Sequence, residues 1–178
     1  MNQFIQFLTY FRIVSAPIIL LLICYLEFYG WALILLLLAG SSDYWDGFLA
    51  RKYHLESAAG EILDPIADKI LITFLILALT LELSSIYIGL AGGLMLAREF
   101  WVGALRDFNS RQGRSDLTTV TFFAKIKTTL QFFTFCSFIA GLYFDNALIL
   151  FISNFLLFLA LVITLKTGIA YTTSTFRK

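Results

Sequence analysis

The sequence contains few charged residues, and this scarcity excludes an ordinary soluble domain. Charged residues make up 14% of the 178-residue chain and hydrophobic residues make up 60%, whereas soluble domains average about 25% charged and about 45–50% apolar residues. A soluble protein of this length could not bury so much apolar surface, and a bilayer removes the need to bury it. We therefore expect an integral membrane protein with one domain over residues 1–178.

Cysteine and histidine are also scarce. The only cysteines are Cys24 and Cys136, and the only histidine is His54. Both cysteines lie in apolar runs, which favours packing residues over a disulfide, and their spacing does not match a metal site. A basic segment is missing from residues 1–10, so the sequence predicts no cleavable signal peptide.

Long apolar runs fill most of the chain. A helix needs about 20 apolar residues to cross a bilayer, and we predict six such spans, at 13–29, 31–50, 62–82, 85–105, 119–143 and 147–165. Apolar residues at positions 4, 5, 7, 8 and 11 predict a short amphipathic helix on the membrane surface before the first span. The predicted fold class is all-α, with six transmembrane helices and one interfacial helix.

Basic residues are absent from every second loop. Tight turns are predicted at Gly30, Ser84-Ser85 and Asp145-Asn146, and no Lys or Arg lies in these loops. Six spans place all 13 basic residues and both termini on the opposite side, which the positive-inside rule makes cytoplasmic. A wrong span count would scatter the basic residues over both sides, so their distribution supports both the count and the orientation.

Four aspartates lie near the ends of the second and third predicted spans. Carboxylates at a membrane boundary are costly and usually functional. Helical periodicity puts Asp43 and Asp46 on one face of one helix, and Asp64 and Asp68 on one face of the next. A hairpin between the helices would turn both faces into one pocket, together with the other residues on these faces: Gly47, Ala50, Arg51 and Gly60.

Clustered carboxylates predict a metal-dependent reaction. They repel one another unless cations neutralise them, and oxygen ligands favour a hard cation such as Mg²⁺ or Mn²⁺. Two such ions commonly bind a phosphate group that undergoes displacement, and Arg51 can bind a phosphate oxygen. The pattern therefore indicates phosphoryl transfer on a lipid-linked substrate. A single aspartate could instead cap a helix, an interpretation that all four together with Arg51 disfavour.

The motif residues form a recognisable pattern. Residues 43–68 read D-Y-W-D-G-F-L-A-R, eight further residues, and G-E-I-L-D-P-I-A-D. This resembles the signature of the CDP-alcohol phosphatidyltransferases, D-x2-D-G-x2-A-R-x8-G-x3-D-x3-D, at all eight defining positions. Further similarity to the bacterial phosphatidylglycerophosphate synthases of this family lies in Leu63–Lys69, Arg98-Glu99 with Leu105-Arg106, and Lys125–Gln131. The N-terminus departs from the pattern, because Ile5-Gln6 replaces a Pro-Asn pair, although Thr9 and Arg12 remain.

The resemblance implies a reaction and a set of roles. CDP-diacylglycerol would donate its phosphatidyl group to an alcohol by in-line attack on the β-phosphorus, and CMP would leave. Two divalent cations would be held by Asp43, Asp46, Asp64 and Asp68, and Asp68 would also act as general base. The residues implied to bind CDP-diacylglycerol are Thr9, Gly47, Ala50, Arg51, Ser57 and Gly60. A homodimer is also implied.

The expected acceptor is sn-glycerol-3-phosphate, which is anionic and needs a second cationic site. The candidates to bind its phosphate are Arg98, Arg106, Lys125 and Lys127. These residues could instead satisfy the positive-inside rule or bind lipid headgroups.

Two alternatives stay open. A cardiolipin synthase that uses CDP-diacylglycerol and phosphatidylglycerol would share the motif, and a non-catalytic cation carrier or scaffold would share the intramembrane acids. The carrier has no need for Gly47, Arg51 and Gly60 at fixed spacing. The expected location is a bacterial inner membrane with the active site facing the cytoplasm, although an organelle membrane also fits. Membrane lipid is an expected partner, and nucleic acid is not.

Overall fold

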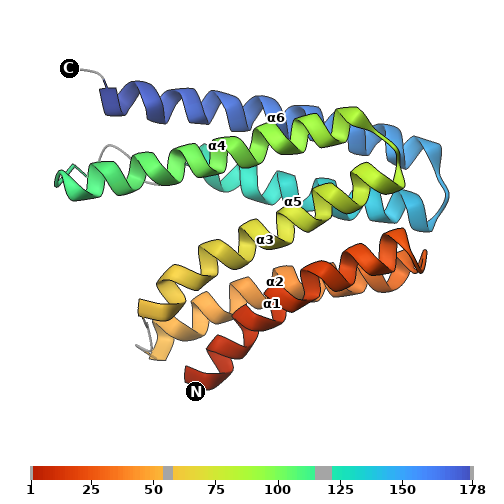
Figure 1. Cartoon of the computed structure of the whole chain (residues 1–178), viewed down its shortest axis with the longest axis horizontal. Helices are drawn as coiled ribbons and strands as arrows, with labels where there is room; N and C mark the ends of the chain where they lie inside the picture. The colour runs from red at the N-terminus through yellow and green to blue at the C-terminus, as the bar shows by residue number, and fades with distance from the viewer. Residues whose placement is uncertain (1, 54–57, 115–121, 177–178) are drawn as a thin grey trace.

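The structure is a computed structural model that describes residues 2–53, 58–114 and 122–176, with side chains over 7–42, 63–114 and 126–176. The described residues form helices joined by short turns, and no strand occurs among them (Figure 1). The helices are α1 (Asn2–Cys24), α2 (Tyr29–Tyr53), α3 (Ala58–Glu82), α4 (Ile86–Arg111), α5 (Phe122–Tyr143) and α6 (Ala147–Phe176). The predicted all-α fold is confirmed.

Three helices contain described segments that are long and apolar enough to cross a membrane. They are Phe7–Cys24 in α1, Ile86–Arg111 and Ala147–Phe176, and α2 adds a shorter apolar stretch, Tyr29–Ser42. These segments agree with an integral membrane protein, and the count of six spans stays a prediction.

The N-terminal segment does not form a separate interfacial helix, and that prediction is wrong. α1 runs without interruption from Asn2 to Cys24, with Pro17 inside it. The reason is visible in its buried positions, because residues 9, 12, 16, 19 and 23 follow one another at intervals of three or four. This spacing forms one continuous buried stripe, so the segment before the first predicted span packs on the same neighbours as the span itself.

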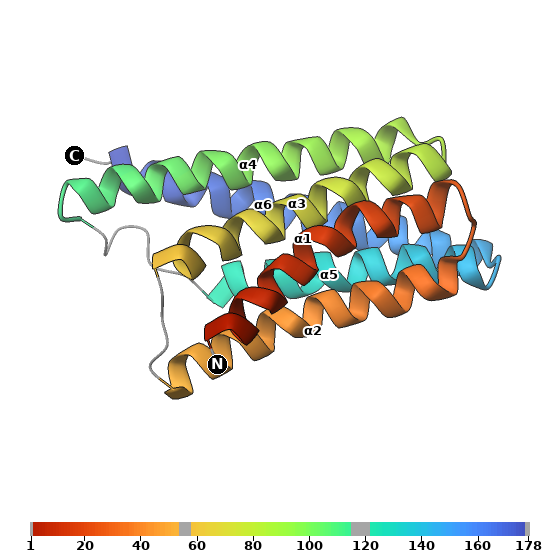
Figure 2. The same cartoon turned by 60° about the horizontal axis from the view of Figure 1, so that its bottom comes forward.

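The six helices form a closed ring. α1 packs against α2 and α3, α2 also packs against α5, α5 against α6, α6 against α4, and α4 against α3 (Figures 1 and 2). The apolar core lies between these helices and includes Ile19, Leu36, Leu79, Met95 and Phe138. Within the ring α3, α1, α2 and α5 are consecutive neighbours, and residues from all four helices line one cavity.

The two ends of the bundle differ. The turns that join α1 to α2, α3 to α4 and α5 to α6 lie at one end, and both termini lie at the other (Figures 1 and 2). Each turn contains a residue with positive φ: Glu27 (52°), Ser84 (45°) and Asp145 (45°). The turns predicted at Ser84 and Asp145 are confirmed, but Gly30 lies inside α2, where an added Cβ would come 2.9 Å from the Tyr143 ring. Glycine is needed there for close packing and not for a turn.

Candidate active site

Two of the predicted aspartates form a carboxylate pair on α3. Asp64 and Asp68 are four residues apart, so they share one face of the helix. Helix α1 supplies a donor to each: Thr9 Oγ1 donates to Asp64 Oδ1 at 2.8 Å, and Arg12 Nη1 donates to Asp68 Oδ1 at 2.6 Å. We call these four residues the carboxylate site. α1 and α3 pack directly on each other, so their contact positions both carboxylates.

Arg12 is a candidate site residue that lies outside the eight motif positions. Its side chain is 1% exposed, whereas that of Asp68 is 49% exposed. A buried guanidinium needs a partner, because an unpaired buried charge is strongly destabilising, and the bond to Asp68 is charge-assisted and short. The signal in the sequence is an arginine three residues after Thr9, next to a long apolar run. Asp68 is thus held by a buried cation while staying accessible.

The predicted nucleotide contact Thr9 has a different neighbour in the structure. Its hydroxyl lies against Asp64, a predicted metal ligand, and the residue is 2% exposed. Thr9 can therefore orient Asp64 through its hydrogen bond, whether or not it also contacts a substrate.

Much of the motif lies outside the described side chains. This applies to Asp43, Asp46, Gly47, Ala50, Arg51 and Gly60, whose backbones belong to α2 and α3. The side chain of the acceptor candidate Lys125, on α5, is also outside the description, and Ser57 lies outside the described residues altogether. Among the described side chains, no group of three or more His, Cys, Asp or Glu is close enough to hold a metal. The four-aspartate cluster stays a prediction. The donor set that is described fits a hard cation, because Asp64 and Asp68 offer carboxylate oxygens and Asp68 is accessible.

A half-open cavity of about 290 Å³ lies next to the carboxylate site. Arg12 and Asp68 form one part of its wall, and α2, α3 and α5 provide the rest. The further lining residues are Ala39, Gly40, Leu71, Ile72, Leu75, Thr128, Thr129, Gln131, Phe132 and Phe135. We call this space the inner cavity. Along α3, Leu75 lies seven residues beyond Asp68, about 10 Å further from the end with the termini. The inner cavity is therefore polar near Asp68 and mostly apolar beyond it.

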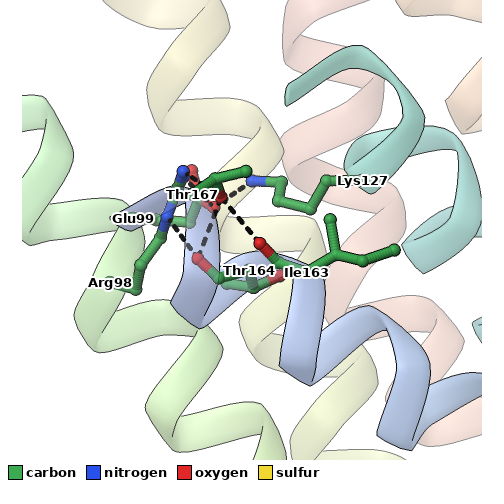
Figure 3. A network of polar contacts seen from close by, with 6 residues as sticks. All are labelled: Arg98, Glu99, Lys127, Ile163, Thr164 and Thr167. Atoms are coloured by element: carbon green, nitrogen blue, oxygen red, sulfur yellow. Dashed lines mark hydrogen bonds and ion pairs between the residues drawn. The ribbon is translucent and has the colours of Figure 1, made fainter. Parts of the chain in front are cut away.

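A second polar group joins α4, α5 and α6 (Figure 3). Arg98 Nη1 on α4 donates to Glu99 Oε1 at 3.1 Å, and Lys127 Nζ on α5 donates to the same oxygen. The side chains of Arg98 and Lys127 are 6% and 4% exposed, and that of Glu99 is 24% exposed. We call these three residues the cation cluster. Two buried cations, Arg98 and Lys127, donate to the same oxygen of Glu99. The space between these two cations therefore suits an anionic group.

Arg98 is fixed to α6 by its other donors. Its Nε donates to Thr164 O at 3.1 Å and its Nη2 donates to Thr167 Oγ1 at 2.7 Å (Figure 3). An added Cβ on Gly168 would come 2.9 Å from Arg98 Cγ, so this glycine makes room for the side chain. The guanidinium therefore has one fixed orientation between two helices.

Arg106 approaches the same region from solvent. It is exposed, and its guanidinium carbon lies 5.6 Å from the centre of the Tyr171 ring, while that of Arg98 lies 5.8 Å from the same centre. Both distances suit a cation–π contact. The structure thus brings together three of the four predicted acceptor residues, namely Arg98, Arg106 and Lys127, and the fourth, Lys125, lies outside the described side chains.

The chain is similar to a family of known enzymes. A family model described as CDP-alcohol phosphatidyltransferase matches residues 5–166. Relatives named CDP-diacylglycerol--glycerol-3-phosphate 3-phosphatidyltransferase include that of Salmonella choleraesuis (strain SC-B67), 34% identical over 128 residues that cover 70% of this chain and 69% of the relative. The protein of that name from Shigella flexneri serotype 5b is 31% identical over 168 residues, which cover 92% of this chain and 90% of the relative. The matching region contains the carboxylate site and the cation cluster.

Proposed function

Because the chain belongs to the CDP-alcohol phosphatidyltransferase family, we propose that it transfers the phosphatidyl group of CDP-diacylglycerol to sn-glycerol-3-phosphate, giving phosphatidylglycerophosphate and CMP. The observation that carries this proposal is the carboxylate site, in which α1 holds Asp64 and Asp68 on one face of α3. The relatives that bear the corresponding name align over as much as 92% of the chain.

Asp68 has the central chemical role in this proposal. Its exposed carboxylate accepts the proton of the acceptor hydroxyl. The acceptor oxygen then attacks the β-phosphorus of CDP-diacylglycerol in line, a new phosphorus–oxygen bond forms, and the bond to the CMP oxygen breaks without a covalent enzyme intermediate. Arg12 orients the Asp68 carboxylate during this step, and Thr9 orients Asp64.

The metal and nucleotide roles follow the motif. Asp43, Asp46, Asp64 and Asp68 would hold two Mg²⁺ or Mn²⁺ ions, which offset phosphate charge when bound. The residues proposed to bind CDP-diacylglycerol are Thr9, Gly47, Ala50, Arg51, Ser57 and Gly60. Glycines allow a phosphate to approach the backbone closely, and an arginine binds phosphate oxygens bidentately.

The acceptor phosphate is proposed to bind at the cation cluster, extended by Arg106 and Lys125. Glu99 already occupies the position of an anion between Arg98 and Lys127. A phosphate that approaches from the exposed side of Glu99 would compete with its carboxylate for these donors, while Arg106 is available from solvent. Glu99 keeps the two buried cations paired when no acceptor is bound.

The proposed setting is a bacterial inner membrane. Six spans, both termini on the cytoplasmic side and an active site facing the cytoplasm would agree with the positive-inside pattern of the sequence. The position of both termini at one end of the bundle supports this arrangement (Figure 2). The family resemblance further suggests a homodimer.

The direct test supplies the purified protein in detergent with CDP-diacylglycerol and Mg²⁺ or Mn²⁺. CMP release is measured with glycerol-3-phosphate, phosphatidylglycerol, inositol phosphate or serine as acceptor. We expect strong CMP release when glycerol-3-phosphate is the acceptor and little release with the other three acceptors. Release only with phosphatidylglycerol would identify a cardiolipin synthase, and no metal-dependent release with any acceptor would favour a carrier or scaffold.

A further inference from the structure

Gln131 is a buried polar side chain without a hydrogen-bond partner for its amide nitrogen. The residue is 3% exposed and lines the inner cavity. Its Nε2 atom has no hydrogen-bond partner among the described residues. Buried donors are nearly always paired in proteins, and an unpaired one needs an explanation. The simplest explanation for a donor at a cavity wall is an acceptor group that enters the cavity.

Gln131 lies near both the cation cluster and the carboxylate site. It lies four residues after Lys127 on α5, one helical turn further from the end with the termini. It lines the same cavity as Asp68 and Arg12. A ligand that reaches Asp68 with a phosphate group can therefore reach Gln131 with a neighbouring part of the same molecule.

The walls of the inner cavity indicate what that part is. Beyond Asp68 and Gln131 the lining becomes apolar, with Leu71, Leu75 and Phe135 in the wall. An occupant must therefore combine a charged group, an uncharged acceptor and hydrocarbon, in that order. A diacylglycerol phosphate has this order, because its ester carbonyls are attached to the glycerol unit that carries the phosphate, and its acyl chains follow.

We infer that Gln131 Nε2 donates a hydrogen bond to an ester carbonyl of the lipid donor, and that the inner cavity holds the glycerol unit and the first part of an acyl chain. This inference rests on the proposed function, since it assumes that the lipid donor reacts at Asp68. Free glycerol-3-phosphate fits less well, because its hydroxyls would lose their hydrogen bonds to water against the apolar walls. Gln131 is then a binding residue for the donor and not for the acceptor.

The test compares two donors that differ only at the ester groups. One is CDP-diacylglycerol, and the other is its dialkyl ether analogue, which keeps the diphosphate and the chains but has no ester carbonyl. CMP release is measured at saturating glycerol-3-phosphate and Mg²⁺ while the donor fraction in detergent micelles is varied. One hydrogen bond corresponds to a preference of about tenfold in kcat/KM, and we expect this preference for the ester donor in the unmodified enzyme.

The variant Gln131→Leu keeps the size of the side chain and removes the amide. We expect it to lose the preference, mainly by a higher KM for the ester donor, with the KM for glycerol-3-phosphate unchanged. Thr134→Val is the matched control, since Thr134 is a buried polar residue on the same helix whose hydroxyl donates to Leu130 O at 2.8 Å. This control should keep the preference.

Several results would overturn the inference. Equal kcat/KM values for both donors in the unmodified enzyme would exclude the ester contact without any variant, so a misfolded Gln131→Leu protein does not weaken the test. A Gln131→Leu effect that is equal for both donors, or that falls on glycerol-3-phosphate, would also exclude it. In all these cases CMP is still released from the donor when glycerol-3-phosphate is the acceptor, so the proposed function stands. Absence of CMP release would contradict the proposed function itself.

Discussion

The carboxylate site and the cation cluster use the same design with opposite charge. In each, a carboxylate is the more exposed partner of a buried cation: Asp68 is 49% exposed against 1% for Arg12, and Glu99 is 24% exposed against 6% for Arg98. The carboxylate site has two carboxylates and one guanidinium, a formal charge of −1, while the cation cluster has two cations and one carboxylate, a formal charge of +1.

One helical bundle therefore contains two regions of opposite net charge, each suited to a partner of the other sign. Buried cations fix the geometry in both places, and the excess charge decides what is attracted. In the proposed function the carboxylate site would attract cations, as two-metal phosphoryl transfer requires, and the cation cluster would attract the anionic acceptor. The following substitutions test this comparison.

The largest effect is expected from Asp68→Asn, which removes the proposed general base and one of the two negative charges of the carboxylate site. We expect kcat to fall by about 10²–10⁴-fold, the usual contribution of a general base. CMP release from saturating substrates is the measurement. Asp107→Asn is the control, because Asp107 is 78% exposed on α4 and pairs only loosely with Arg111, at 3.7 Å. Equal activity of the two variants would contradict the role of Asp68.

Arg12→Met tests whether the buried cation positions the carboxylate. We expect activity to fall by about 10–100-fold and the Mg²⁺ concentration for half-maximal activity to change, because such supporting residues tune metal sites by this amount. Arg12→Lys keeps the charge and should recover part of the loss. A metal titration measures the effect, and an unchanged half-maximal concentration in Arg12→Met would show that Arg12 only stabilises the fold.

Arg106→Ala tests the accessible side of the cation cluster. We expect the KM for glycerol-3-phosphate to rise about tenfold, corresponding to one charge-assisted contact, with little change in the KM for CDP-diacylglycerol. Arg111→Ala is the control, since Arg111 is 83% exposed and lies one turn further along α4. An equal rise in the KM values for both substrates would contradict a role of Arg106 in binding the acceptor.

Gly92→Ala tests the packing between the two regions, where α4 meets α3. An added Cβ would come 2.4 Å from Ile76, whereas at the neighbouring Gly93 nothing lies within 4 Å. We expect Gly92→Ala to destabilise the protein by about 1–3 kcal/mol and Gly93→Ala to be neutral or slightly stabilising. Thermal unfolding in detergent compares the pair, and equal melting temperatures would contradict the described contact.

The sequence predicts the helices better than their ends. Hydropathy places the fourth and sixth spans at 85–105 and 147–165, but α4 continues to Arg111 and α6 to Phe176. The extensions are polar and bond to each other, since Asn109 Nδ2 donates to Thr175 Oγ1 at 2.8 Å. Within the predicted fourth span, Trp101 Nε1 also donates to Thr172 Oγ1 on the α6 extension, at 2.9 Å. A search for apolar runs stops where these polar residues begin, although the helices do not.

The candidate site shows the same limit. Motif spacing predicts that Asp64 and Asp68 share a face, since both lie on one helix. The partners Thr9 and Arg12 come from a helix more than 50 positions away, so their contacts depend on how α1 packs on α3. The role proposed for Gln131 also depends on the cavity that four helices form, and the sequence alone does not predict this cavity.

The decisive measurement for the proposed phosphatidyl transfer is CMP release from CDP-diacylglycerol by the unmodified protein and by Asp64→Asn, with and without glycerol-3-phosphate and Mg²⁺. We predict CMP release that requires both the acceptor and the metal and that is lost in Asp64→Asn. Full release by Asp64→Asn, or no release by the unmodified protein with glycerol-3-phosphate, would contradict it.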